Sequence, residues 1–311
     1  MNVLETSGLG KRYRSTWALR ECNLAVPAGR IVALVGPNGA GKTTLLHCAV
    51  GLIPPTTGSI TVLDGFAAGS PGALESIAFV AQDAPLHQHL SVQAMLSVAA
   101  GLNTRFDEPE AIRRLTALGI PHDRKVARLS GGQQAQLALT LSVARSPSLL
   151  VLDEPLARLD PLARHDFMAH VMATVAEQEM SVLFSSHVVS ELGRVADYLV
   201  VLASGRVQMA GDIDELLASH MLLSGPADDA ERIARRFPVV QSVGAGRRVQ
   251  MLVRVGRPSD QPGSTETLDA GWERDEVSLE ELVLGYLRDP AASMLPGPMG
   301  QLPDDARELA R

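Results

Sequence analysis

A glycine-rich segment near the beginning of the chain has the residue types and spacing of a phosphate-binding loop. It follows the apolar run 31–35, and its members are Gly36, Pro37, Asn38, Gly39, Ala40, Gly41, Lys42, Thr43 and Thr44. Glycines let the backbone turn N–H groups toward a phosphate, Lys42 adds a positive charge, and the Thr43 hydroxyl can ligate Mg²⁺. A helix over 44–50 would point the positive end of its dipole at the same anion. The alternative is a glycine-rich turn between core elements, but the spacing favours a nucleotide triphosphate site.

Two carboxylates follow a short apolar run in the middle of the chain. Residues 149–152 predict a buried strand, and Asp153 and Glu154 come directly after it. Parallel sheets bind ligands at the carboxyl edge of their strands, where both acids would lie. Asp153 suits the coordination shell of Mg²⁺, and Glu154 is placed to take a proton from an attacking water. Alone, the pattern also fits a strand that enters a solvated turn; together with the phosphate loop it favours catalysis.

A second potential anion site opens an apolar-periodic helix. Its members are Leu129, Ser130, Gly131, Gly132 and Gln133. Small residues at a helix start leave backbone N–H donors uncovered. The simpler alternative is a serine N-cap followed by a flexible turn. If both helix starts bind phosphate, they can face different nucleotides across a dimer.

The elements that must position these residues alternate between strands and helices. Strands are expected at 3–6, 22–26, 58–63, 77–80, 149–152, 181–184 and 198–202. Because helices are expected between the later strands, the pattern predicts a parallel sheet covered on both faces, interrupted by helices over 90–128. Beyond residue 220 we expect a helix, two strands and an amphipathic helix at 230–237, 239–243, 248–255 and 277–287. A polar linker over 256–271 and a disordered end of the chain are also expected.

Composition argues against several classes of protein. The chain has 311 residues, a formal net charge of −7 and no long basic tract, which disfavours a nucleic-acid-binding face. Cys22 and Cys48 fit neither a metal site nor a disulfide framework, so we expect buried thiols in a reducing compartment. We find no secretion signal and no uncharged apolar run of about eighteen residues, so we expect a cytoplasmic protein without a membrane span.

In this order, the phosphate loop, the motif Leu129–Gln133 and the strand before Asp153 resemble the nucleotide-binding subunit of ATP-binding-cassette (ABC) transporters, of the exporter-like ABC-2 type. The resemblance covers about residues 1–218. It implies an α/β fold of the P-loop NTPase class, with a parallel sheet core and an N-terminal antiparallel β subdomain. The expected units are a cassette over 1–220, with a helical insertion at about 83–145, followed by a small α+β extension over 221–289 and a disordered tail over 290–311.

Four further residues match family positions one by one. Tyr13 resembles the aromatic residue that stacks on adenine, and Gln82 resembles the glutamine that reaches Mg²⁺. Asp160 resembles the aspartate that communicates between paired sites, and His187 resembles the histidine that contacts the γ-phosphate. The simpler alternatives are an exposed strand tyrosine, a solvated loop glutamine and a core histidine.

The resemblance also implies a working assembly. Two copies would sandwich two ATP molecules, each between Lys42 and Thr43 of one protomer and the start of the Ser130 helix of its partner. Where the family usually has basic residues this chain has Gln134, Ala135 and Gln136, and Arg158 replaces a small residue. These departures remove no nucleotide contact, so we expect an active ATPase.

The leading functional hypothesis is a Mg²⁺-dependent ATPase subunit that powers export. A separate integral membrane permease would hold it at the inner face of the cell membrane. One alternative is a cassette ATPase that acts on ribosomes or DNA, although this chain lacks the second cassette or long coiled coil usual there. Another is a module that senses ATP without turnover, against which Glu154 and His187 argue. The extension matches no motif and could regulate, stabilise the dimer or cap the sheet.

Overall fold

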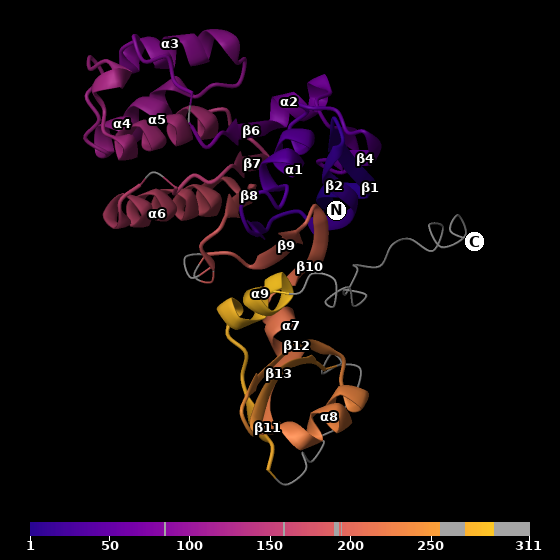
Figure 1. Ribbon diagram of the computed structural model, residues 1–311. Coiled ribbons are helices and arrows are strands. Elements are labelled where there is room, and N and C mark those ends of the chain that lie inside the picture. The colour runs from indigo at the N-terminus through magenta and orange to yellow at the C-terminus, as the bar shows by residue number, and fades with distance from the viewer. Residues whose placement is uncertain (84, 158, 190–192, 194, 256–270, 289–311) are drawn as a thin grey trace.

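The computed structural model describes the chain except residues 84, 158, 190–192, 194, 256–270 and 289–311. Figure 1 shows a larger body of layered sheets and helices at the top and a smaller body, built by the last part of the chain, below it. Among the described residues, no helix combines the length and apolar character needed to cross a membrane.

A six-stranded sheet forms the centre of the larger body, in the order β10-β9-β3-β8-β7-β6. The bounds are β3 Ile31–Val35, β6 Ile77–Val80, β7 Leu149–Leu152, β8 Ser181–Ser186, β9 Tyr198–Ala203 and β10 Arg206–Asp212. The expected parallel sheet is confirmed except at its edge, where β10 runs antiparallel to β9. The sequence analysis missed β10 because the two-residue turn Ser204-Gly205, with both φ values positive, reverses the chain without a helix.

Each face of this sheet packs on a different layer. Leu149 and Val151 belong to the core shared with α1 (Lys42–Ala49) and the N-terminal strands. Their neighbours Leu150 and Leu152 belong to the core shared with α5 and α6, which span Gly131–Val143 and Pro161–Gln178. Burial on both faces explains why β7 is an uninterrupted apolar run.

The N-terminal strands form an antiparallel sheet in the order β2-β1-β4-β5, as the resemblance implies. The bounds are β1 Asn2–Tyr13, β2 Thr16–Pro27, β4 Thr57–Val62 and β5 Phe66–Ala67, and α2 (Pro71–Ser76) follows. The first two strands are longer than expected because register shifts interrupt the apolar alternation that marks a strand in the sequence. Cys22 and Cys48 are both buried, as predicted.

The helical insertion packs around a small core of its own. It contains α3, α4, a 3₁₀ turn and α5, over Val92–Leu102, Glu108–Ala117, Val126–Arg128 and Gly131–Val143. The side chains of Ser91 and Asp107 cap the first two helices. Leu96, Leu115 and Leu137 are buried together in this core. The expected helical character of this segment is confirmed.

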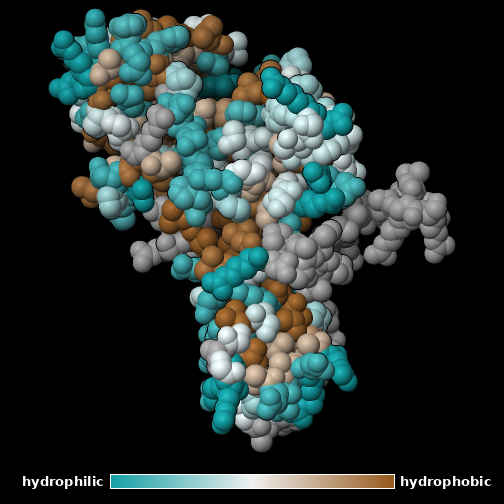
Figure 2. All heavy atoms as spheres, viewed as in Figure 1, coloured by the Kyte–Doolittle hydropathy of each residue, from teal (hydrophilic) through white to brown (hydrophobic). Residues whose placement is uncertain are grey.

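The extension is a four-stranded antiparallel sheet with helices on both faces. The strand order is β12-β13-β11-β14, with β11 His220–Pro226, β12 Val239–Ala245, β13 Arg248–Arg254 and β14 Glu273–Asp275. The helices are α7 Ile213–Ala218, a 3₁₀ turn Ala227–Asp229, α8 Ala230–Arg236 and α9 Leu279–Arg288. One face packs on α8 around Trp272, whereas Leu282 and Val283 of α9 join the core of the central sheet. Figure 2 shows hydrophobic residues gathered where the two bodies meet.

The α+β character of the extension is confirmed, and its remaining details differ. The expected boundary between residues 220 and 221 falls inside β11, which the sequence analysis did not predict, so the division into units stays a proposal. Residues 256–270 of the expected linker, the tail from residue 290 and part of the helix expected between β8 and β9 lie outside the described residues.

Candidate active site

The phosphate loop lies between β3 and α1, as predicted. The helix begins at Lys42 rather than Thr44, and Gly41 precedes it with a φ of 106°. A Cβ atom on Gly41 would lie 2.5 Å from the carbonyl oxygen of Ala18, and one on Gly36 would lie 2.1 Å from that of Leu202. Glycine is therefore required at both positions, because neighbouring strands support the loop at backbone contact distance.

Lys42 is buried and joins the loop to the end of β7. Its Nζ donates hydrogen bonds to the carbonyl oxygens of Gly36 at 2.8 Å and Pro37 at 3.4 Å. The same Nζ lies 3.1 Å from Oε1 of Glu154, and the two side chains are 6% and 10% exposed. This ion pair places a positive and a negative group beside the loop that would hold phosphates.

Glu154 also contacts His187. Nδ1 of His187 lies 2.5 Å from Oε2 of Glu154, and the histidine side chain is 48% exposed. The core-histidine alternative is therefore wrong. A hollow of about 10 Å³, lined in part by Glu154, Ser185 and His187, lies beside this contact. That volume is at the lower limit of what one water molecule needs.

Ser185, which the sequence analysis did not select, links the two acids. Its Oγ donates a hydrogen bond of 2.7 Å to Oδ1 of Asp153 and accepts one of 2.8 Å from the backbone N–H of Glu154. Glu154 has a φ of 46°, a left-handed conformation that costs a non-glycine residue about 1–2 kcal/mol. The available signal was the pair of serines that ends the apolar run of β8.

The residues predicted to bind Mg²⁺ have suitable chemistry. Thr43, Gln82 and Asp153 offer hydroxyl, amide and carboxylate oxygens, which are ligands that Mg²⁺ prefers. They follow β3, β6 and β7 at the carboxyl edge of the sheet, and Asp153 is buried there. Across the described residues there is no cluster of three or more histidine, cysteine or acidic side chains that could hold a metal alone. The donor set therefore fits a magnesium ion shared with nucleotide phosphates.

The motif beginning at Ser130 forms a capped helix start. Ser130 Oγ accepts a hydrogen bond of 3.2 Å from the N–H of Gln133, whose Oε1 accepts one of 3.1 Å from the N–H of Ser130. Ser130 is the N-cap that the simpler alternative names, but the helix begins directly at Gly131 and not after a turn. Ser130 and Gly131 are exposed, whereas the Gln133 side chain is used in the cap. No hydrogen bond or ion pair within the described part of the chain joins this motif to Lys42 or Glu154, so its phosphate contact stays a prediction.

The roles that the resemblance gives to Asp160, Tyr13 and Gln82 stay predictions. Asp160 is exposed and caps α6 through a 3.0 Å hydrogen bond from the N–H of Ala163. A Cβ on Gly132 would lie 3.2 Å from Cβ of Ala163, so the starts of α5 and α6 are neighbours. Tyr13 is 47% exposed at the end of β1. Arg158, the departure in the Asp160 loop, lies outside the described residues.

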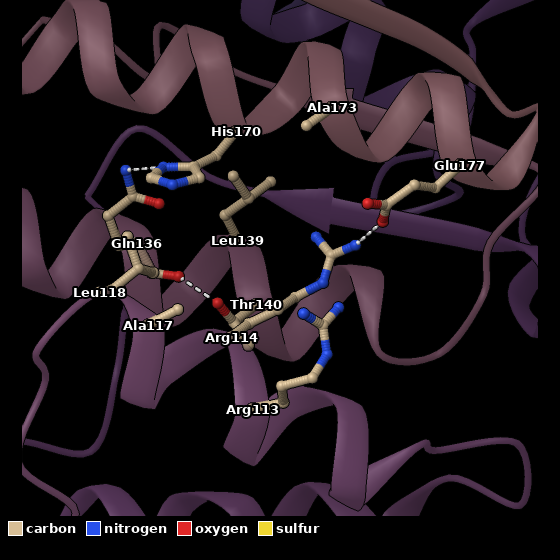
Figure 3. Close-up of a pocket in the computed structure, with 10 residues that line it drawn as sticks. All are labelled: Arg113, Arg114, Ala117, Leu118, Gln136, Leu139, Thr140, His170, Ala173 and Glu177. Atoms are coloured by element: carbon tan, nitrogen blue, oxygen red, sulfur yellow. Dashed lines mark hydrogen bonds and ion pairs between the residues drawn. The ribbon is translucent and has the colours of Figure 1, made fainter.

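A second, larger hollow lies between α4, α5 and α6 (Figure 3). Its volume is about 160 Å³, and its lining includes Gln136, whose Nε2 lies 3.0 Å from Nδ1 of His170. Across it, Arg114 of α4 binds Oγ1 of Thr174 at 2.5 Å and Oε2 of Glu177 at 2.6 Å. The departure at Gln136 therefore places a buried amide between the insertion and α6.

Comparison with known proteins identifies the family. The sequence profile of the ABC transporter family matches residues 19–157. The thiamine import ATP-binding protein ThiQ of Shigella sonnei is 34% identical over 203 residues, 63% of this chain and 87% of that protein. The molybdenum import ATP-binding protein ModC of Pseudomonas syringae is 36% identical over 217 residues, 67% of this chain and 60% of that protein.

A solved structure shows the same fold. The structure of cbiO1 from Clostridium perfringens, described as part of the ABC transporter complex cbiONQ, is 26% identical. It has a TM-score of 0.60 and covers 76% of this chain and 95% of that one. The expected direction of transport, export, has no support: relatives named for molybdenum, thiamine, sulfate or Fe(3+) are import proteins. The chain belongs to the ABC transporter family as an ATP-binding subunit, and the cassettes of this family hydrolyse ATP to power transport.

Proposed function

We propose that this chain hydrolyses ATP for a transporter whose permease is a separate polypeptide. The contact among Lys42, Glu154 and His187 carries the proposal, because it brings a phosphate-binding cation, a base and a histidine to one edge of the sheet. Lys42 and the loop N–H groups hold the phosphates, and Glu154 takes a proton from the attacking water. His187 orients Glu154 and contacts the γ-phosphate.

The ion pair between Lys42 and Glu154 makes the base dependent on the nucleotide. Oε1 of Glu154 lies 3.1 Å from Nζ of Lys42, so the carboxylate is held by the group that would bind the phosphates. Phosphate oxygens compete with Glu154 for Lys42, so nucleotide binding releases the carboxylate toward water. Thr43, Gln82 and Asp153 would hold Mg²⁺, which supplies positive charge to the phosphates when bound.

The active assembly is a head-to-tail dimer. The start of α5 at Ser130 and Gly131 is exposed, and within the described residues it makes no bond to Lys42 or Glu154 of its own chain. It is therefore available to a nucleotide bound by a second copy of the chain. Donors from both protomers on one γ-phosphate would make dimerisation depend on ATP, since ligand and partner bind together. Tyr13 would stack on the adenine, and Asp160 would lie beside the partner's site.

The permease would hold the dimer at the inner face of the cell membrane. This placement is supported by relatives that are import ATP-binding subunits and by cbiO1, which belongs to a multi-subunit complex. Co-purification with an integral membrane protein would support it. Co-sedimentation with ribosomes instead would favour the alternative in which the cassette acts outside a transporter.

Glu154→Gln tests the catalytic part of the proposal. It keeps the size of the side chain but removes the base, so we expect turnover to fall at least about 100-fold. We expect ATP binding to persist and the dimer to accumulate in size-exclusion chromatography with ATP. Glu231→Gln, at a glutamate 88% exposed on α8, is the matched control. Unchanged turnover would exclude Glu154 as the base, and a variant that stays monomeric with saturating ATP would exclude the sandwich.

A further inference from the structure

The end of β8 carries a buried hydroxyl that the reaction as described above does not use. Ser185 has no exposed surface, and its Oγ lies between two consecutive residues of the neighbouring strand end, Asp153 and Glu154. We propose that Ser185 is a positioning residue for hydrolysis, which orients the Asp153 carboxylate and holds the Glu154 backbone in the conformation that aims its side chain at the site. The inference rests on the roles proposed for these two acids.

The hydrogen-bond directions are determined by the chemistry of the groups. The N–H of Glu154 can only donate, so Ser185 Oγ accepts at 2.8 Å, and its single proton is then available to Oδ1 of Asp153 at 2.7 Å. One hydroxyl therefore serves a backbone donor and a carboxylate acceptor at once.

The backbone of Glu154 gives the first bond its importance. Its φ of 46° is unfavourable for a residue with a side chain, so neighbouring contacts must maintain it. The Ser185 hydroxyl is one such contact, and the carbonyl oxygen of Glu154, which accepts from the N–H of Ala157, is another. Relaxation toward a more common φ would swing the side chain away from Lys42 and His187, since both bind its carboxylate.

Three substitutions and one matched control test the proposal. Ser185→Ala removes both bonds, Ser185→Cys keeps the volume with a weak donor and acceptor, and Ser185→Thr restores the hydroxyl. Ser181→Ala is the control, because Ser181 begins the same strand, is 3% exposed and accepts a 2.8 Å hydrogen bond from the N–H of Gly29. It removes a similar buried bond without touching the acids.

We expect Ser185→Ala and Ser185→Cys to lower kcat about 10- to 100-fold, because a displaced carboxylate and base are no longer aligned with the reacting atoms. KM, and the affinity for a fluorescent ATP analogue without Mg²⁺, should change less than about threefold. Ser185→Thr should recover most of kcat. Ser181→Ala should lower the thermal unfolding midpoint and keep kcat.

Other results would overturn the inference. They are a kcat of Ser185→Ala or Ser185→Cys within about twofold of the original chain, an equal loss in Ser181→Ala, or no recovery in a folded Ser185→Thr. If Ser185→Ala does not fold, Ser185→Cys decides alone. Glu154→Gln, measured in parallel, separates the two failures. If it also keeps full turnover, the proposed site is wrong; if it is inactive while the Ser185 variants are active, only the positioning role is wrong.

Discussion

At the scale of single residues, the candidate site depends on charge placed next to opposite charge. Lys42 and Glu154 are both nearly buried, so the attraction between their charges offsets the cost of removing each side chain from water. A motif or a strand end in the sequence marks four of the candidate residues, which are Lys42, Asp153, Glu154 and His187, so these could be predicted. For Ser185 the sequence offers only the pair of serines that ends β8, which does not reveal a bond to a neighbour 31 positions away in the chain.

Lys42→Ala should weaken ATP binding at least about tenfold, because the phosphates lose a charged donor that lies in a site of low exposure. The substitution also leaves Glu154 beside a loop without its cation. Binding can be measured with a fluorescent ATP analogue. Lys125→Ala, at an exposed lysine in the helical insertion, should bind ATP like the original chain. Equal losses in both variants would contradict a specific contact at Lys42.

At the scale of elements, the short apolar strands β6 and β7 of the central sheet were predictable, and several longer or edge strands were not. The predicted bounds of β6 and β7 match the structure because every residue of β7, and most of β6, faces a core. The prediction made β1 and β2 too short and missed β10 and β11. Register shifts, a two-residue hairpin and pairing with distant strands determine them, and none of these leaves a periodic signal in one sequence.

Helix α4 is tied to α6 by one arginine across the hollow of Figure 3. Arg114 is 18% exposed and also binds Glu110 on its own helix. We expect Arg114→Ala to lower the free energy of unfolding by about 1–3 kcal/mol, because Thr174 and Glu177 lose a charged donor. Chemical denaturation would measure this loss.

The neighbouring arginine provides the control for that variant. Arg113 is 66% exposed and pairs with Glu110 on its own helix, so Arg113→Ala should destabilise the protein less than Arg114→Ala. If the second variant is destabilised as much as the first, the bridge between the insertion and α6 is not the source of the effect. A Glu177→Gln variant combined with Arg114→Ala would then show no coupling energy.

At the scale of the whole molecule, a buried polar pair lies in the seam between the larger body and the extension. Nε2 of His220, at the start of β11, lies 2.9 Å from Oη of Tyr286 on α9, and Nδ1 lies 2.7 Å from the carbonyl oxygen of Leu216. Burial lowers the pKa of His220 and raises the pKa of Tyr286 to about 12. Both side chains are therefore held in their neutral forms.

The lowered pKa of His220 predicts acid sensitivity. Below the ordinary histidine pKa of about 6.5 the unfolded chain takes up a proton that the folded chain does not. His220 should therefore not reduce the free energy of unfolding above about pH 6.5. Below that pH the free energy of unfolding should fall by up to ~1.4 kcal/mol per pH unit, until the lowered pKa is reached. Urea unfolding at several pH values would measure this, with His220→Gln reducing the slope. His165→Gln, at a histidine 81% exposed, should leave the slope unchanged.

The same seam affects how the protein could be rearranged. Leu282 and Val283 pack in the core of the central sheet. The extension is therefore part of the hydrophobic core of the ATPase and not a separate appendage. Cutting the chain near residue 220 would divide β11 and remove the side chains of α9 from that core. Chimeras that exchange this extension between cassettes should stay soluble only when the graft starts before α7 and brings matching apolar partners for β9 and β10.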